Sequence, residues 1–151
     1  MERHHGAAEV IVGADTRESG PWIAGLVASG LAVSGVRTRY AGLITTPGVA
    51  FLARTGPFAA GVMISASHNP YRDNGIKVLD HSGFKLPDDQ ERAIEQDIFA
   101  ALEAGVVPAA IELERDPGLD DEYVAYLEST MPLRLDGLSL TVDAAHGSAS
   151  F

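Results

Sequence analysis

The stretch EVIVGADTRESGPWIAGLVASGLAVSG, from Glu9 to Gly35, decides the fold class of this chain. Its β-branched run over residues 10–12 is typical of a buried strand, and Gly13 ends that strand. Pro21 suits the first turn of a helix, and apolar residues then continue as far as Gly35. The pattern predicts a strand followed directly by a helix.

The same alternation continues into the middle of the chain. VRTRYAG at 36–42 alternates like a strand, and TTPGVAFLART at 45–55 starts like a helix, with Thr45 or Thr46 before a proline. AAGVMIS at 59–65 is typical of a third strand. Strands and helices in this order, joined by short loops, form parallel βαβ units. We therefore predict an α/β fold with a mixed, largely parallel sheet and helices on both faces.

The later part of the chain predicts two helices and one more strand. PDDQERAIEQDIFAALEAG at 87–105 is amphipathic, and DDEYVAYLEST at 120–130 follows it as a second helix. LSLTVDAAHGSASF at 138–151 opens like another buried strand. We place a domain boundary near Leu135. Residues 1–135 would form one domain, and residues 136–151 would be the first strand and start of a second.

Composition excludes several classes of partner and site. The chain has 11 lysines and arginines against 21 acidic residues, a formal charge of -10, which argues against nucleic acids and anionic membranes as partners. It has no cysteine, so disulfides and zinc-thiolate sites are excluded. No apolar run reaches the roughly 18–20 residues that cross a bilayer, and we expect a cytoplasmic location. His4 and His5 are only half of a metal site and are expected to be a solvated tail.

The segment GVMISASHNPYRDNGIKVLD, at 61–80, combines a serine, a histidine and a lysine around a turn. It follows a predicted strand, at the sheet edge where open α/β folds bind ligands, and the turn at 73–75 carries Lys77 back toward Ser67. A hydrolytic pair of Ser67 and His68 is disfavoured, because neighbouring side chains of an extended segment point to opposite sides and no G-x-S-x-G elbow is present. Residue types and spacing alone favour a solvated turn over a reacting site.

The longer string SASHNPYRDNGIK resembles the active-site serine loop of the α-D-phosphohexomutase family. Four flanking strings resemble that family in the same order: VGADTRESG, TTPGVAFL, SGFKL and TVDAAHGSAS. The resemblance runs from Val10 to Ser150. It implies the first α/β domain of such an enzyme and the beginning of its second domain.

The resemblance also implies roles for individual residues. Ser67 matches the serine that is phosphorylated in the resting enzyme, gives its phosphoryl group to a sugar monophosphate and takes one back from a bisphosphate. His68 and Asn69 match residues that position substrate and phosphate, and Lys77 matches a proposed general acid/base. Which of Lys77 and His68 moves the proton stays open.

Two further positions and two small ligands belong to the same set of expectations. Asp15 and Arg17 match a D-T-R turn that lines the cleft, and they are expected to bind substrate or phosphate. Mg²⁺ is the expected metal, with a Ser67 phosphate oxygen as one of its ligands, because hard oxygen ligands suit this ion. A hexosamine 1,6-bisphosphate is the expected intermediate and activator.

The implied activity is that of an isomerase that moves a phosphoryl group within a sugar phosphate. The wording ISASHNP resembles the branch of the family that interconverts glucosamine 6-phosphate and glucosamine 1-phosphate. The alternatives are the branch that acts on mannose and glucose phosphates, and a non-catalytic module that binds sugar phosphates. The expected partner is thus a phosphosugar, and the sequence leaves the oligomeric state open.

The chain also departs from the family pattern. The D-G-D-x-D-R string that holds the metal does not occur, and neither does the G-T-D-G-I-R-G segment with its strand and helix at the start. Ala14 stands where the family has Arg or Lys, and His146 stands where it has Asn. We therefore expect a fragment that is not a competent mutase alone.

Overall fold

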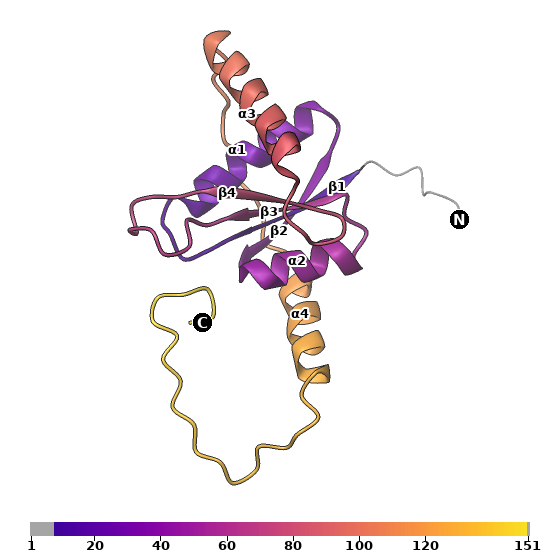
Figure 1. Cartoon of the computed structure of the whole chain (residues 1–151), viewed down its shortest axis with the longest axis vertical. Coiled ribbons are helices and arrows are strands. Elements are labelled where there is room, and N and C mark those ends of the chain that lie inside the picture. Colours follow the sequence, from indigo (N-terminus) through magenta and orange to yellow (C-terminus); the bar gives the residue numbers. More distant parts are fainter. Residues whose placement is uncertain (1–7, 151) are drawn as a thin grey trace, which may run out of the picture.

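The computed structural model describes residues 8–150, so His4 and His5 lie outside the described residues. The described chain forms four strands and four helices, which alternate in its first half (Figure 1). The elements are β1 (Glu9–Ala14), α1 (Gly20–Val33), β2 (Arg37–Leu43), α2 (Thr46–Thr55), β3 (Ala60–Ile64), β4 (Ile76–Asp80), α3 (Asp88–Glu103) and α4 (Pro117–Ser129).

The sheet has the strand order β2-β1-β3-β4. β1 pairs in parallel with β2 and with β3, whereas β4 returns antiparallel to β3. The helices α1 and α2 serve as crossovers between the parallel strands, whereas the loop at 65–75 contains no helix, and β4 returns antiparallel after it. The prediction of a mixed, largely parallel sheet is confirmed.

Helices cover both faces of the sheet, also as predicted (Figure 1). Alternate residues of β1 face opposite sides: Ile11 packs with Leu52 of α2, and Val12 packs with Ala24 of α1. The start of α2 is the expected one, because the Thr45 side chain accepts a hydrogen bond from the backbone N–H of Gly48 at 3.3 Å.

The helix α4 packs on the outer side of α2. Leu119 is fully buried there, and the Phe51 ring of α2 stacks on Tyr126 with ring centroids 4.1 Å apart. Arg39 of β2 binds Asp116, the N-cap of α4, at 2.6 Å and lowers the pKa of that carboxyl. The bond stabilises the fold above the usual pKa of an aspartate, and this stabilisation is lost as the pH falls through the lowered value.

The C-terminal segment contains no strand among its described residues. Residues 130–150 form turns and extended chain, and the strand expected to open the segment at 138–151 is absent. Its apolar side chains Leu138, Leu140 and Val142 are exposed. A strand needs a neighbour for its backbone hydrogen bonds, and no described segment pairs with this one. The division into residues 1–135 and 136–151 stays a prediction.

Candidate active site

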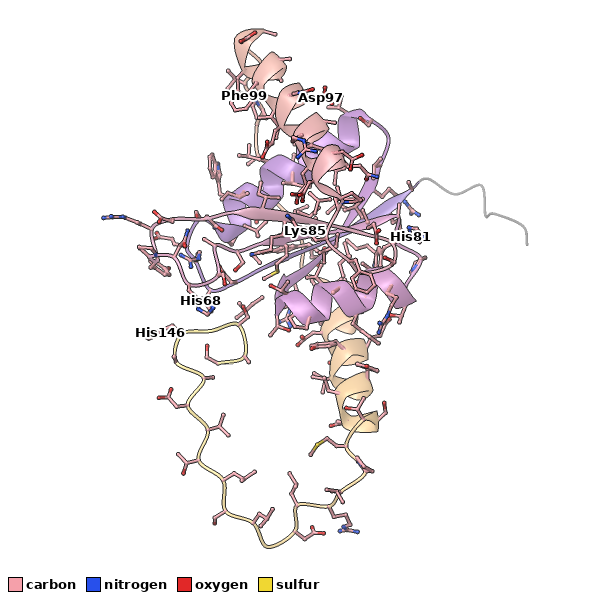
Figure 2. All side chains as sticks on the ribbon, viewed as in Figure 1. His68, His81, Lys85, Asp97, Phe99 and His146 are labelled. Atoms are coloured by element: carbon pink, nitrogen blue, oxygen red, sulfur yellow. The ribbon has the colours of Figure 1, made fainter. Side chains whose placement is uncertain are left out.

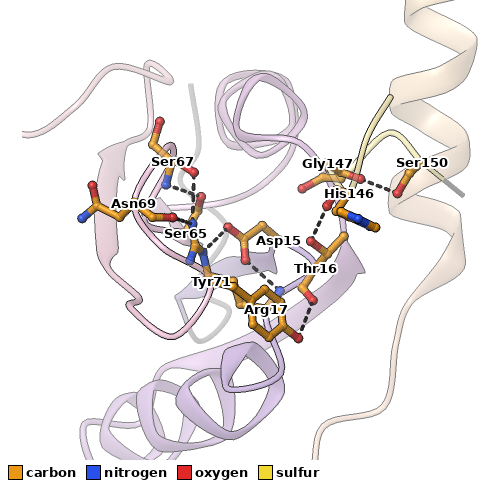
Figure 3. Close-up of a pocket in the computed structure, with 11 residues that line it drawn as sticks. Asp15, Thr16, Arg17, Ser65, Ser67, Asn69, Tyr71, His146, Gly147 and Ser150 are labelled. Atoms are coloured by element: carbon orange, nitrogen blue, oxygen red, sulfur yellow. Dashed lines mark hydrogen bonds and ion pairs between the residues drawn. The ribbon is translucent and has the colours of Figure 1, made fainter. Parts of the chain in front are cut away.

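Two loops meet at the carboxyl ends of the parallel strands β1 and β3. The loop after β1 contains Asp15, and its N–H donates to the carbonyl of Ile64 at the end of β3 at 3.0 Å. The loop after β3 leads through Ser65, whose N–H donates to the carbonyl of Gly75 at 2.9 Å. Because these strands are neighbours, residues far apart in sequence surround one cavity of about 780 Å³ (Figure 3).

Ser67 lies exposed on the loop that follows β3 and lines this cavity. Its φ of 55° is in the left-handed region, which costs a non-glycine residue about 1–2 kcal/mol. The Ser67 N–H donates to the Ser65 hydroxyl at 3.1 Å, which helps to hold this conformation. A strained, exposed hydroxyl at the edge of a cavity is a typical arrangement for a reacting group.

The left-handed φ of Ser67 leads to a prediction about the stability of two variants. We expect Ser67→Gly to raise the free energy of unfolding above that of Ser67→Ala by about 1 kcal/mol, because glycine adopts a left-handed φ without a Cβ clash. Urea denaturation of the two variants measures the difference. Equal midpoints, or a more stable alanine variant, would show that the loop relaxes out of the left-handed conformation.

Arg17 is nearly buried, with only 6% of its side chain exposed. Its guanidinium donates to Asp15 and to four backbone carbonyls of the loop after β3. Asp15 itself accepts from both the backbone N–H and the Nε–H of Arg17. Both residues line the cavity, as predicted, but the guanidinium is engaged with protein oxygens; phosphate binding by either residue stays a prediction.

The antiparallel return brings Lys77 to the serine loop, as the sequence predicted. Lys77 lies opposite Met63 in the β3–β4 ladder, is half-buried, and its Nζ donates to the carbonyl of Ser65 at 2.9 Å. Asn69 lines the cavity, whereas His68 and Lys77 are not among the described residues that line it. His68 is exposed and lies on the same side of the molecule as His146 (Figure 2).

Sequence reasoning missed Tyr71 and the far wall of the cavity. The Tyr71 hydroxyl accepts from the backbone N–H of Glu18 at 3.0 Å and so links the two loops. The far wall is residues 146–148 and 150, held by a 2.5 Å hydrogen bond from the Thr16 hydroxyl to the His146 carbonyl. Tyr71 follows Asn69-Pro70 directly and could have been noticed as an amphipathic side chain in the loop. The contact of Thr16 with His146 joins residues too distant for a local pattern.

The residues that the structure describes do not assemble a metal site of their own. No group of three histidine, aspartate or glutamate side chains among residues 8–150 could hold a metal ion. Ser67 is the one predicted ligand that this chain provides, so magnesium binding stays a prediction. Within the same range, no helix is long and apolar enough to cross a membrane.

Comparison with known proteins connects this site to one family. Residues 1–104 match the family described as phosphoglucomutase/phosphomannomutase, alpha/beta/alpha domain I. A phosphoglucosamine mutase of Solibacter usitatus is 57% identical over 146 residues, which cover 97% of this chain and 33% of that protein. One from Bordetella pertussis is 47% identical, over 93% of this chain and 32% of the relative.

Solved structures agree with this assignment. A putative phosphomannomutase from Thermus thermophilus has a TM-score of 0.55 at 32% identity, over 74% of this chain and 24% of that one. A phosphoglucomutase/phosphomannomutase family protein from Burkholderia thailandensis has a TM-score of 0.64 at 26% identity, over 82% of this chain and 28% of that one. The chain spans about a third of the length of the curated relatives it matches. It belongs to the phosphoglucomutase/phosphomannomutase family and contains the family's α/β/α domain I.

Proposed function

We propose that this chain is the phosphoryl-carrying domain of a phosphoglucosamine mutase, with Ser67 as the carrier. The observation that carries the proposal is the position of Ser67. Its hydroxyl is exposed in a strained loop beside a cavity of about 780 Å³, a size that suits a small-molecule ligand. The named relatives that match nearly the whole chain support the same class of enzyme.

The proposed reaction has two phosphoryl transfers. In the first, a hydroxyl oxygen of the sugar monophosphate attacks the phosphorus of phosphorylated Ser67 and gives its proton to a base. The bond from phosphorus to Ser67 Oγ breaks, and this oxygen takes up a proton. In the second, Ser67 Oγ loses that proton and attacks the other phosphate of the resulting bisphosphate. The sugar oxygen that leaves is protonated, and phosphoserine is restored.

Positioning and charge stabilisation supply most of the catalysis in phosphoryl transfer. Lys77 is the proposed acid and base, because its ammonium group already lies 2.9 Å from the Ser65 carbonyl, two residues before the carrier. His68 is the alternative, and Asn69 is proposed to orient the phosphate from the cavity wall. The Ser67 phosphate would give Mg²⁺ one oxygen ligand, and its other ligands would come from residues outside this chain.

Glucosamine phosphates are the proposed substrates because the relatives at 57% and 47% identity are named for them. The second candidate, action on mannose or glucose phosphates, is favoured by the names of the solved structures at 32% and 26% identity. A hexosamine 1,6-bisphosphate is the proposed intermediate, and a cytoplasmic location is part of the same proposal.

Two chimeras test the proposal. In the first, called the mutase chimera, this chain replaces its matching segment in the Solibacter usitatus relative; in the second it replaces that of the Thermus thermophilus protein. We expect the first to interconvert glucosamine 6-phosphate and glucosamine 1-phosphate with a kcat/KM close to that of its parent, and the second to fall far below its own parent. If the second chimera kept the activity of its parent and the first lost it, action on mannose or glucose phosphates would be favoured. Folded chimeras that bind sugar phosphates without converting them would favour the non-catalytic module.

A further inference from the structure

We propose that Arg17 is a positioning residue that clamps the serine loop, residues 66–75, and thereby presents Ser67 to the cavity. The inference rests on the proposed function in one respect, that Ser67 is the reacting residue. It gives Arg17 a task that differs from direct phosphate binding.

The evidence is the way in which the guanidinium uses its hydrogen-bond donors. An arginine side chain has five N–H donors, one on Nε and two on each terminal nitrogen. Here each of them has a protein acceptor. Nε donates to the Asp15 carboxylate at 3.0 Å, Nη1 to the carbonyls of Pro70 at 2.5 Å and Asp73 at 2.8 Å, and Nη2 to those of Ser67 at 3.0 Å and Asn69 at 2.9 Å. No N–H group of Arg17 is left to bind a phosphate oxygen.

The four carbonyls give the serine loop its shape. The loop is irregular, and its own backbone bonds from Asn69 to Ala66 and from Asp73 to Pro70 satisfy only part of its polar groups. Three of the four carbonyls, those of Ser67, Asn69 and Asp73, have no backbone donor among the described residues, and an unpaired carbonyl removed from water costs free energy. The planar fork of one guanidinium meets all four carbonyls. Figure 3 shows Arg17 with two of the four residues, Ser67 and Asn69.

The clamp acts on the reacting residue itself. The Ser67 carbonyl accepts from Nη2, and fixing that carbonyl fixes the ψ angle of Ser67, whose φ is the left-handed 55°. Asp15 neutralises the buried guanidinium, so the pair adds little net charge at the loop. Within the serine loop, Arg17 contacts no side chain. All four acceptors that the loop offers to Arg17 are backbone oxygens. Its shape therefore depends on the residue that donates to it.

Lysine is the informative substitution at this position. Arg17→Lys keeps the positive charge beside Asp15, but a single ammonium group has three donors and cannot span four carbonyls. The proposal therefore predicts that the loop loosens although the charge is conserved. Arg37→Lys is the matched control, because Arg37 is exposed and its ion pair with Glu9 lies at the opposite end of β1.

Limited digestion of the chain by trypsin reports on the loop directly, without any phosphoryl transfer. Arg72 lies within the serine loop with 89% of its side chain exposed, so cleavage after it depends on how freely the backbone moves. Arg134, with 88% of its side chain exposed, lies outside the fold core and is an internal reference. We expect Arg17→Lys to speed cleavage after Arg72 by about tenfold or more relative to cleavage after Arg134. Arg37→Lys should leave this ratio unchanged.

Kinetics of the mutase chimera supply the second readout. A carrier serine that is displaced by about 1 Å loses on the order of 10²-fold in rate. We therefore expect Arg17→Lys to lower kcat by about 10²-fold and to change KM much less, because most of the residues that line the cavity lie outside the loop. If Arg17 bound the substrate phosphate directly, the substitution would instead raise KM.

An unchanged Arg72-to-Arg134 cleavage ratio in a folded Arg17→Lys chain would overturn the clamp. Far-UV circular dichroism identifies an unfolded variant, in which the ratio would rise for another reason. Asp15→Asn, which weakens the contact with Nε and leaves the four carbonyl contacts in place, then replaces Arg17→Lys and should raise the ratio by a smaller factor. The digestion decides the clamp even if the mutase chimera has no activity at all. Failure of the proposed function and failure of the clamp are thus separate results.

Discussion

Ser67→Ala is expected to reduce turnover of the mutase chimera by on the order of 10⁵-fold or more. The substitution removes the only oxygen in the proposal that can accept and return the phosphoryl group. Binding of sugar phosphate should persist, because the Ser67 backbone and the remaining cavity wall are unchanged. Initial rates with glucosamine 6-phosphate measure the loss, and equilibrium binding of the same compound shows that the cavity is intact.

The matched control is Ser34→Ala. Ser34 is the exposed C-cap of α1, at the end of that helix opposite the cavity, and its substitution should leave turnover within a factor of two or so of the parent. If the Ser67→Ala chimera kept more than about a tenth of the parental rate, another residue would have to carry the phosphoryl group.

The second large effect is expected at Lys77. Lys77→Met should lower kcat by about 10²–10⁴-fold, the usual contribution of a general acid/base, because methionine fills the same space without a transferable proton. Lys77→Arg should fail as well, since arginine keeps its proton throughout the accessible pH range. The pH dependence of kcat checks the role: one limb of the profile should disappear in both variants.

His68 competes for the same role and provides the contrast. His68 is exposed, whereas Lys77 is half-buried and held against the Ser65 carbonyl, so His68→Ala should cost less than Lys77→Met and should keep both limbs of the pH profile. If His68→Ala removed a limb and Lys77→Met did not, the proton would move through the histidine.

Most of the fold could be predicted from sequence because its signals are local. The β-branched run at Val10 predicts the strand β1, and Thr45 before its proline predicts the start of α2, each from a few neighbouring residues. The prediction of a strand in 138–151 was wrong for a reason that no local pattern contains. Its apolar residues suit a strand, but a strand also needs a neighbour, and the described chain supplies none.

The sequence predicted which residues belong to the site better than it predicted what each of them contacts. The turn after β3 brings Lys77 back to the serine loop, and this follows from turn chemistry and an antiparallel return. Most contacts of Arg17 could not be read from residue types, because four of its five acceptors are backbone carbonyls, which every residue has. Their convergence depends on the conformation of the loop. For the same reason the wall near His146 became visible only in three dimensions.

Phosphopeptide mapping of the purified mutase chimera tests the central claim most directly. The account predicts one phosphoryl group on Ser67 in the resting enzyme. Glucosamine 1- or 6-phosphate should remove it, a hexosamine 1,6-bisphosphate with Mg²⁺ should restore it, and the Ser67→Ala chimera should lack it. An active chimera that carries its phosphoryl group on another residue, or that turns over while Ser67 is never phosphorylated, would contradict the account.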